Sequence, residues 1–168
     1  MADVSNSKLL QTTTGIQHSN ACVVIVRTEW NATIVDELEK GCLKAFEREG
    51  QTEIKVISVP GAFEIPFGIK SYWDANKYRD DRPMAFIALG CVLRGDTPHF
   101  EYVCRGVTDG VMQLNLSLPV PVIFGVLTVD NDQQAQERIG GKHGHKGEEA
   151  AITALKMISV TQSFKKHQ

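Results

Sequence analysis

The sequence lacks any long hydrophobic run. Its longest apolar stretches, PVIFGVL and MAFIALGCVL, are far shorter than the about 20 residues that a helix needs to cross a bilayer. The polar start MADVSNSK does not resemble a signal peptide. We therefore expect a cytoplasmic protein that does not span a membrane.

The sequence also lacks an excess of charge of either sign. It has 18 Lys and Arg residues against 20 Asp and Glu residues, a formal net charge of −2. Nucleic acids and anionic membranes attract proteins through basic surfaces, and this balance gives no such surface. We expect neither kind of partner.

Paired cysteine motifs and the common nucleotide-binding motifs are missing. The four cysteines, Cys22, Cys42, Cys91 and Cys104, form no CxxC pair and lie in apolar segments, which favours buried, reduced thiols over a disulfide framework. There is no GxGxxG and no Walker lysine pattern. Ordinary nucleotide-binding classes are therefore disfavoured.

No linker, tandem repeat or low-complexity tract divides the chain. At 168 residues, 42% of them hydrophobic, one domain can bury roughly 70% of the surface that its unfolded form exposes. Residues 1–20 are polar and predict a flexible arm, in which KLLQTTT could add one short edge strand. We expect a single domain over residues 21–168.

Strand and helix patterns alternate through that domain. Strands are predicted at residues 21–26, 53–59, 84–90 and 121–128. Helices are predicted at residues 31–50, within 59–77, and at 99–118, 130–139 and 146–164. Continuous β-branched runs such as ACVVIV are typical of strands buried on both faces. The alternation predicts an α/β fold, a three-layer α/β/α sandwich around a four-stranded parallel sheet.

The most unusual segments all follow strands. RTEWN, VPGAFE, CVLRGDTPH and TVDND come after the four strands in turn, whereas the opposite connections have ordinary turn chemistry. In open parallel sheets, ligands bind beyond the carboxyl ends of the strands. The sequence therefore predicts a ligand site at that edge.

The segment GDTPH has the features of an anion site with a proton-transfer group. Thr97 and Pro98 are typical of a helix N-cap and first helical residue, and a helix N-terminus binds anions. Gly95 would let a ligand approach the backbone, and His99 in the first turn could act as acid and base. The same residues could simply start a helix, and the charge of Asp96 would repel a phosphate unless it points away.

Three other residues at this edge allow a structural or a functional interpretation. Trp30 and Phe63 could bind a ligand or be core aromatics, which is the commoner case. Glu64 could bind a ligand or be a carboxylate at a helix start.

The segment GGKHGHKG, residues 140–147, invites a metal interpretation through His143 and His145. One HxH with no adjacent carboxylate is weak support for zinc. Lys142 and Lys146 favour an anion or a carbonyl instead. The glycines predict a loop with a permissive backbone.

Four segments, in order and with matching spacing, closely resemble the lumazine synthase family: VPGAFEIP, LGCVLRGDTPHFEYV, PVIFGVLTVDNDQQAQER and GKHGHKGEEAA. The resemblance covers roughly residues 21–160. It implies a flavodoxin-like sandwich and an enzyme that condenses 5-amino-6-(D-ribitylamino)uracil with 3,4-dihydroxy-2-butanone 4-phosphate. The product would be 6,7-dimethyl-8-ribityllumazine, with phosphate and water released and no cofactor or metal involved.

The resemblance also implies roles for individual residues. Trp30 would stack on the pyrimidine, and Asn31 and Glu64 would meet the ribityl chain. Backbone groups would hold the remaining polar edges, at Ala62, Phe63, Val92 and Leu93. Phosphate would be bound by Gly95, Asp96, Thr97 and Arg138, and His99 would shuttle protons. A neighbouring subunit would supply Phe124, Arg138 and Lys146.

The chain departs from the family pattern at two positions. Asp96 stands where many relatives have a small residue, which leaves only its backbone for phosphate. His145 stands where asparagine is expected. Neither change removes a group that the chemistry requires.

The resemblance implies an assembly as well. Lumazine synthases form homopentamers, some of which stack twelve together into an icosahedral shell, and the N-terminal segment pairs with a neighbour's sheet. The short connection before the last helix favours the shell, and riboflavin synthase is a possible partner. Three alternatives stay open: a flavin or lumazine storage module, a shell protein whose sites have lapsed, and a flavodoxin-like electron carrier.

Overall fold

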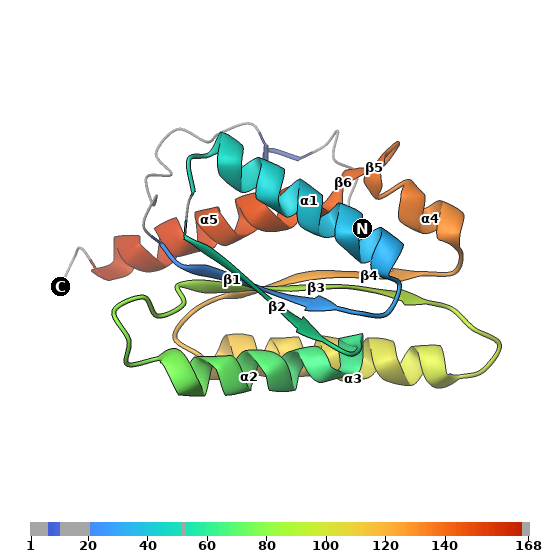
Figure 1. Cartoon of the computed structure of the whole chain (residues 1–168), viewed down its shortest axis with the longest axis horizontal. Coiled ribbons are helices and arrows are strands. Elements are labelled where there is room, and N and C mark those ends of the chain that lie inside the picture. The colour runs from blue at the N-terminus through green and yellow to red at the C-terminus, as the bar shows by residue number, and fades with distance from the viewer. Residues whose placement is uncertain (1–6, 11–20, 52, 166–168) are drawn as a thin grey trace.

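A four-stranded parallel sheet forms the centre of the computed structural model, which describes residues 7–10, 21–51 and 53–165. The strands are β1 (Val23–Thr28), β2 (Ile54–Val59), β3 (Ala85–Leu93) and β4 (Val122–Val129). Their order across the sheet is β2-β1-β3-β4, and all neighbours are parallel (Figure 1). The predicted sheet is confirmed.

Helices cover both faces of this sheet, as predicted. One layer contains α1 (Ala32–Arg48) and α5 (Lys146–Lys165), and the other contains α2 (Ile65–Asn76) and α3 (His99–Ser117) (Figure 1). Side chains of β1 alternate between two cores: Val23 and Ile25 face α1 and α5, whereas Val24 and Val26 face α2 and α3. Burial on both faces explains the continuous β-branched run in the sequence.

Local sequence sets the ends of the helices. Beyond α1, Gly50 adopts a positive φ of 71°, its N–H donates to the Glu47 carbonyl at 3.1 Å, and the Gln51 N–H donates to the Phe46 carbonyl at 2.9 Å. This is the Schellman pattern that the predicted glycine stop requires. Pro66 lies in the first turn of α2, where it removes no helical hydrogen bond.

A short 3₁₀ turn, η2 (Ala62–Glu64), precedes α2, and both pack closely on α3. A Cβ atom at Gly106 would lie 2.4 Å from a ring carbon of Phe63, and one at Gly110 would lie 2.4 Å from Cγ of Pro66. The two glycines that weaken α3 locally therefore allow the close approach of η2 and α2.

Three predicted segments differ from the structure. Ile139, predicted as the end of a helix, and residues 140–145, within the segment 140–147 predicted as a loop, form an antiparallel hairpin of β5 (Ile139–Gly141) and β6 (Gly144–His145). Gly140 and Gly144 there have φ of 115° and 76°, which confirms the permissive backbone. In addition, β3 continues past the predicted end at residue 90 to Leu93. The helix predicted at residues 130–139 is also shorter in the structure: α4 (Asp132–Gln136) begins after Asn131, whose side chain accepts from the Gln134 N–H at 2.9 Å, and it ends three residues before the predicted end.

Residues 8–10 of the N-terminal arm form a turn on the same chain's α5. Lys156 of α5 donates to the carbonyl oxygens of Lys8, at 3.5 Å, and of Leu9. The rest of KLLQTTT lies outside the described residues, so an added edge strand and the boundary between arm and domain stay predictions.

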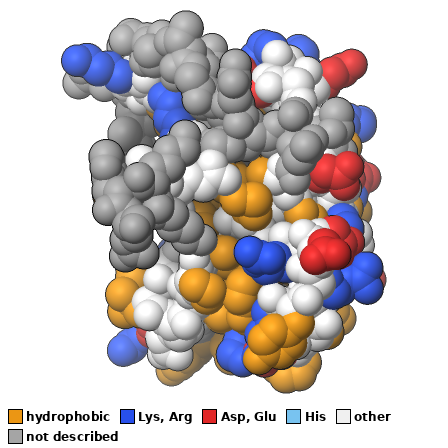
Figure 2. Space-filling model, turned by 90° about the vertical axis from the view of Figure 1, so that its left-hand side faces the viewer, with side chains coloured by type: hydrophobic (Ala, Val, Ile, Leu, Met, Phe, Trp, Pro, Cys, Tyr) orange, Lys and Arg blue, Asp and Glu red, His pale blue; other side chains and the backbone are white. Residues whose placement is uncertain are grey.

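The amino ends of the strands form the opposite end of the molecule. Figure 2 shows that end, where apolar side chains gather centrally with charged side chains along one side. A small hollow of about 150 Å³ lies there, lined in part by Cys22, Met84 and Val120. The four cysteines are free thiols, as predicted, but only Cys22, Cys42 and Cys91 are buried, whereas Cys104 is partly exposed. Among the described helices, none combines the length and the apolar character needed to cross a bilayer.

Candidate active site

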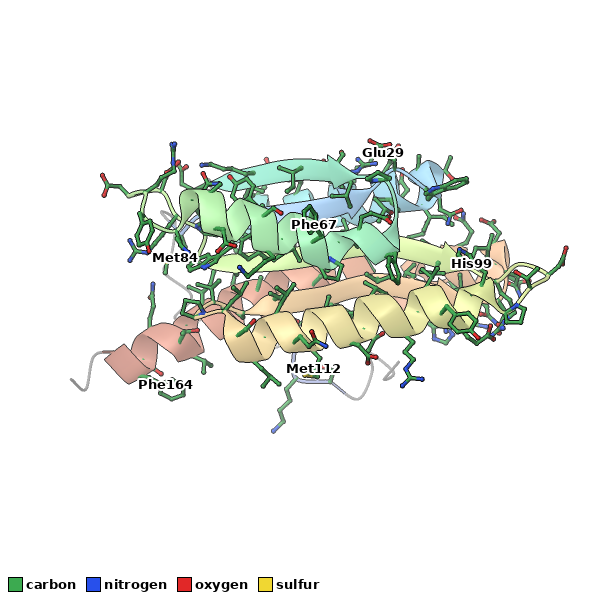
Figure 3. The ribbon with its side chains drawn as sticks, turned by 90° about the horizontal axis from the view of Figure 1, so that it is seen from below. Glu29, Phe67, Met84, His99, Met112 and Phe164 are labelled. Atoms are coloured by element: carbon green, nitrogen blue, oxygen red, sulfur yellow. The ribbon has the colours of Figure 1, made fainter. Side chains whose placement is uncertain are left out.

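A cleft of about 660 Å³ opens at the carboxyl ends of β1 and β3, between η2 and the start of α3. This is the edge that the sequence predicts, and the volume suits a small organic ligand, for which roughly 300–1,000 Å³ is typical. Figure 3 shows Glu29, just after β1, and His99, at the start of α3, at this same end. The cleft is lined by Trp30, Asn31, Gly61, Ala62, Phe63, Glu64, Cys91, Val92, Leu93, His99, Tyr102 and Val103.

The two aromatic side chains of the predicted site are not core residues. Trp30 is 73% exposed and Phe63 is 59% exposed, although both line the cleft. The backbone of Trp30 is held: its N–H donates to the Pro60 carbonyl at 3.2 Å, and the Thr28 hydroxyl donates to its carbonyl at 3.2 Å. The structure therefore presents an aromatic face to a ligand on a fixed backbone.

Asn31 joins the two strands that end at the cleft. It adopts a left-handed conformation, with φ 56° and ψ 43°, as the N-cap of α1. Asparagine tolerates this region better than most residues. Its side-chain nitrogen donates to the Cys91 carbonyl at 2.8 Å, which leaves the amide oxygen available to a ligand.

Glu64 lies at the N-cap of α2 but forms no side-chain capping bond. Its carboxylate lies over Gly61, where a Cβ atom would be 2.9 Å from Oε2, so Gly61 makes room for it. The position is a helix start, as one interpretation expected, yet the carboxylate lines the cleft instead of capping the helix.

The wall beside His99 is formed by the end of β3. Val92 is buried, whereas Leu93 is 38% exposed. Burial raises the pKa of the neighbouring Cys91 thiol to about 12. Cys91 is therefore a neutral lining group and not a thiolate nucleophile.

Of the predicted phosphate-binding residues, Gly95, Asp96 and Thr97 lie in the exposed connection between β3 and α3. The helix begins at His99, and Pro98 is its N-cap in place of the predicted Thr97, although the His99 N–H has a long contact of 3.4 Å to the Thr97 hydroxyl. A Cβ atom at Gly95 would meet nothing within 4 Å. This part of the backbone is open to a ligand, next to His99.

Arg94 fixes this connection at its base. Its guanidinium donates to Asp130 at 2.6 Å and to Glu101, and it stacks over the Phe100 ring at 4.1 Å. Hydrogen bonds from Arg94 hold the pKa values of Glu101 and Asp130 below their ordinary range. Because Arg94 already pairs with the carboxylates of Asp130 and Glu101, it stabilises the loop and is not a free cation for a ligand.

The three residues expected from a neighbour lie outside the cleft of their own chain. Phe124 is 42% exposed on β4. Arg138, just after α4, donates from Nη1 to the Gln134 carbonyl at 2.7 Å, and its buried Nε has no partner among the described residues. Lys146 is 7% exposed and donates to both carboxylate oxygens of Glu149, at 2.7 and 2.9 Å.

Sequence reasoning missed four lining residues, namely Gly61, Cys91, Tyr102 and Val103. Tyr102 and Val103 stand three and four residues after His99, the spacing that places helical side chains on one face. Their spacing from His99 could have identified both residues from the sequence. Nothing in the sequence marked Cys91, which the extension of β3 brings to the cleft although its side chain is part of the buried core on the α1 and α5 side.

The described residues contain no cluster of three or more His, Cys, Asp or Glu side chains that could hold a metal ion. Of the two histidines considered, His143 faces Glu137 at 3.7 Å. The HxH segment therefore gives no metal site in the described part of the chain.

An open parallel sheet whose carboxyl edge holds an aromatic, polar-edged cleft beside a helix-start histidine defines an α/β enzyme for small molecules. The sequence profile of the 6,7-dimethyl-8-ribityllumazine synthase family matches residues 20–162. The chain belongs to this family and is an enzyme of it.

Individual relatives support this family assignment. The 6,7-dimethyl-8-ribityllumazine synthase of Bacteroides fragilis is 48% identical over 145 residues, 84% of this chain and 97% of the relative. The enzyme of the same name from Parabacteroides distasonis is 47% identical over 139 residues, 82% of this chain and 84% of the relative. The enzyme of the same name from Porphyromonas gingivalis is 50% identical over 138 residues, which are 81% of this chain and 83% of the relative.

Proposed function

We propose that the chain carries out the reaction of its family in the cleft at the carboxyl ends of β1 and β3. It condenses 5-amino-6-(D-ribitylamino)uracil with 3,4-dihydroxy-2-butanone 4-phosphate. The amine and the ketone form a Schiff base with loss of one water, phosphate leaves, and ring closure releases a second water. The observation that carries the proposal is the pair of exposed aromatic rings, Trp30 and Phe63, in one cleft with His99.

The pyrimidine and its ribityl chain occupy the aromatic side of the cleft. A planar heterocycle gains most from an aromatic face, which Trp30 supplies. The amide oxygen of Asn31 and the carboxylate of Glu64 are hydrogen-bond acceptors suited to a polyol. Backbone groups of Ala62, Phe63, Val92 and Leu93 line the same cleft and hold the polar edges of the ring.

The phosphate of the second substrate lies at the connection before α3. Backbone N–H groups of residues 95–97 and the positive end of the 19-residue α3 favour an anion there. Asp96 is exposed, and this arrangement requires its carboxylate to point away from the phosphate. His99 then lies beside the leaving group, where an imidazole can transfer protons during both imine formation and phosphate loss.

A neighbouring subunit completes the site with Phe124, Arg138 and Lys146. Two observations support this arrangement: these residues lie outside the cleft of their own chain, and the outer faces of η2, α2 and α3 carry exposed apolar side chains. These include Phe67, Tyr102, Met112 and Leu116, at 78%, 71%, 58% and 82% exposure. Figure 3 shows Phe67 and Met112 on this side of the molecule. Several large apolar side chains exposed on one side of the molecule favour subunit contact there.

We infer a homopentamer, with the arm paired to an edge of a neighbour's sheet. The shell of twelve pentamers, the cytoplasmic location and a partnership with riboflavin synthase are further predictions from the sequence.

Turnover of both substrates tests the function. The purified chain should form lumazine absorbance above the spontaneous background and release phosphate faster when the pyrimidine is present. His99→Ala should lower kcat about 10²-fold, the usual size of a general acid–base contribution. Lys44→Ala, an exposed change on α1, is the matched control.

The alternatives predict different results. Pyrimidine or flavin binding without turnover would favour a storage module or a shell protein with lapsed sites, and would overturn the enzymatic proposal.

A further inference from the structure

The two cations assigned to the neighbour's site lie at the base of one hairpin. Arg138 directly precedes β5, and Lys146 directly follows β6. The Lys146 N–H donates to the Arg138 carbonyl at 2.8 Å, and Ile139 pairs with His145 in the next position of the ladder. Any displacement of this hairpin therefore moves both cations together.

The imidazole of His145 packs into a notch on α1. Gly41, in the middle of α1, is buried, and a Cβ atom there would lie 2.0 Å from Cε1 and 2.3 Å from Nδ1 of His145. The His145 ring therefore occupies the place that a methyl group at Gly41 would take, and such a methyl group would displace the ring from it. The notch and the ring have complementary shapes.

The residues after His145 continue this contact. A Cβ atom at Gly147 would lie 2.0 Å from the Leu38 carbonyl oxygen, so the start of α5 touches the backbone of α1. The Cys42 thiol donates to the Gly147 carbonyl at 3.0 Å. Burial raises the pKa of Cys42 to about 12, so this thiol keeps the proton that it donates.

Within the described part of the chain, no hydrogen bond at Nδ1 holds the His145 ring in this place. Nδ1 of His145 is buried and has no partner among the described residues. Burying a polar nitrogen without a partner is unfavourable, so the ring is held in the notch by its shape and by the ladder on either side.

We propose that His145 is a positioning residue, which through Gly41 fixes the hairpin and thereby aims Arg138 and Lys146 at the adjoining subunit's substrate. The inference rests on the proposed function, since it takes from there the role of Arg138 in phosphate binding. His145 touches no substrate. Its effect is transmitted by the ladder between β5 and β6 and by the Lys146–Arg138 backbone bond.

Inhibition by inorganic phosphate and steady-state kinetics of the assembled enzyme test the proposal. His145→Ala should raise both the KM for the butanone phosphate and the inhibition constant of inorganic phosphate about tenfold, because small misplacements of a positioning group cost this much or more. The change in kcat should be smaller than the change in these two constants. A residue needed only for folding would lower the amount of active enzyme and leave both constants unchanged.

Gly41→Ala approaches the same contact from the other side. With His145 present, the added methyl group displaces the ring, so the phosphate constants should rise and the thermal midpoint should fall. With His145→Ala in the same chain, the methyl group enters an empty notch, and alanine is favoured over glycine in a helix. Gly41→Ala should then raise the thermal midpoint. If Gly41→Ala shifted the thermal midpoint in the same direction with and without His145→Ala, the contact between Gly41 and His145 would be refuted.

Arg138→Ala separates the positioning role of His145 from the phosphate-binding role of Arg138. If it raises the phosphate constants while folded His145→Ala and Gly41→Ala enzymes leave them unchanged, the positioning role is wrong and the phosphate assignment stands. If Arg138→Ala itself leaves them unchanged, the phosphate assignment fails, whatever His145 does. Lys44→Ala, on the exposed face of α1, is the control for these variants and should leave the phosphate constants unchanged.

Discussion

At the scale of single residues, the cleft contains side chains placed against their usual preference. Trp30 and Phe63 stay largely exposed, although full burial of a phenylalanine would contribute about 2 kcal/mol. Asn31 holds a left-handed backbone that few residues tolerate. Such exceptions gather at functional sites, where ligand binding decides the placement instead of folding stability. They lie side by side in this chain and all line the proposed pyrimidine site.

The exposure of Trp30 gives a prediction that separates binding from stability. Trp30→Ala should raise the KM for the pyrimidine about tenfold or more, because stacking of a base on an aromatic ring contributes about 1–3 kcal/mol. The free energy of unfolding should change by less than about 0.5 kcal/mol, as for most surface substitutions. Steady-state kinetics and denaturant unfolding measure the two effects.

Two variants check that interpretation. Trp30→Phe keeps an aromatic face and should retain most of the affinity. Tyr78→Ala removes a 91% exposed ring that does not line the cleft, and should change neither quantity. An equal loss of stability and affinity in Trp30→Ala would mean that the ring packs within the protein.

At the scale of elements, the connection between β3 and α3 depends on charge. Hydrogen bonds from Arg94 depress the folded-state pKa values of Glu101 and Asp130, so these contacts add stability at pH values above the ordinary carboxyl range. That contribution is lost as the pH falls through the depressed values. The loop that offers its backbone to phosphate should therefore loosen in acid.

Carboxyl titration by NMR measures this dependence. In Arg94→Gln, the pKa values of Glu101 and Asp130 should both rise toward the ordinary range. Asp74, whose pKa is lowered by Lys70 and then Lys77 of its own segment, is an internal control that should not move. Unchanged values for Glu101 and Asp130 would show that Arg94 does not hold the loop.

The glycines of α3 give a second prediction for this layer. Alanine normally stabilises a helix over glycine by about 1 kcal/mol. Here Gly110→Ala should instead lower the free energy of unfolding by about 1–3 kcal/mol, because the added methyl group overlaps the Pro66 ring. Gly106→Ala should change it less, because the half-exposed ring of Phe63 can move aside. Denaturant unfolding measures the change.

The two substitutions should differ in catalysis. Gly106→Ala displaces Phe63, which lines the cleft, and should also raise the KM for the pyrimidine. Gly110→Ala displaces Pro66, which does not line it, and is the matched control. If both left the unfolding free energy unchanged or higher, the close packing of η2 and α2 on α3 would be disproved.

Elements with strong periodic or β-branched patterns could be predicted from the sequence, and so could the edge of the sheet at which the cleft opens. The hairpin at residues 139–145 could not, because its glycines are equally typical of an open loop and its two strands are too short to show alternation. Nor could local sequence decide whether Trp30 faced the core or the cleft. That depends on the path of the chain after β1, which Asn31 sets through its bond to β3.

At the scale of the whole molecule, the proposed function requires a site that one chain does not complete. The sequence resemblance placed Phe124, Arg138 and Lys146 in a neighbour, and the structure keeps them out of the cleft that contains His99. A mass measurement by light scattering should therefore find at least five chains together. Phe67→Glu and Leu116→Glu, on the exposed apolar face, should reduce that mass and the activity together.

A shared site also predicts that two inactive enzymes restore each other. His99→Ala and Arg138→Ala should each be impaired alone. When the two are dissociated, mixed and reassembled, some interfaces join an intact His99 from one chain to an intact Arg138 from the next, so activity should rise above that of either variant. Because each such interface needs two different chains, the gain should depend on the mixing ratio and be greatest near equal amounts. Mixing without dissociation is the control. If reassembly gave only the average of the two activities, His99 and Arg138 would act within one chain, and the proposal of a site between subunits would be wrong.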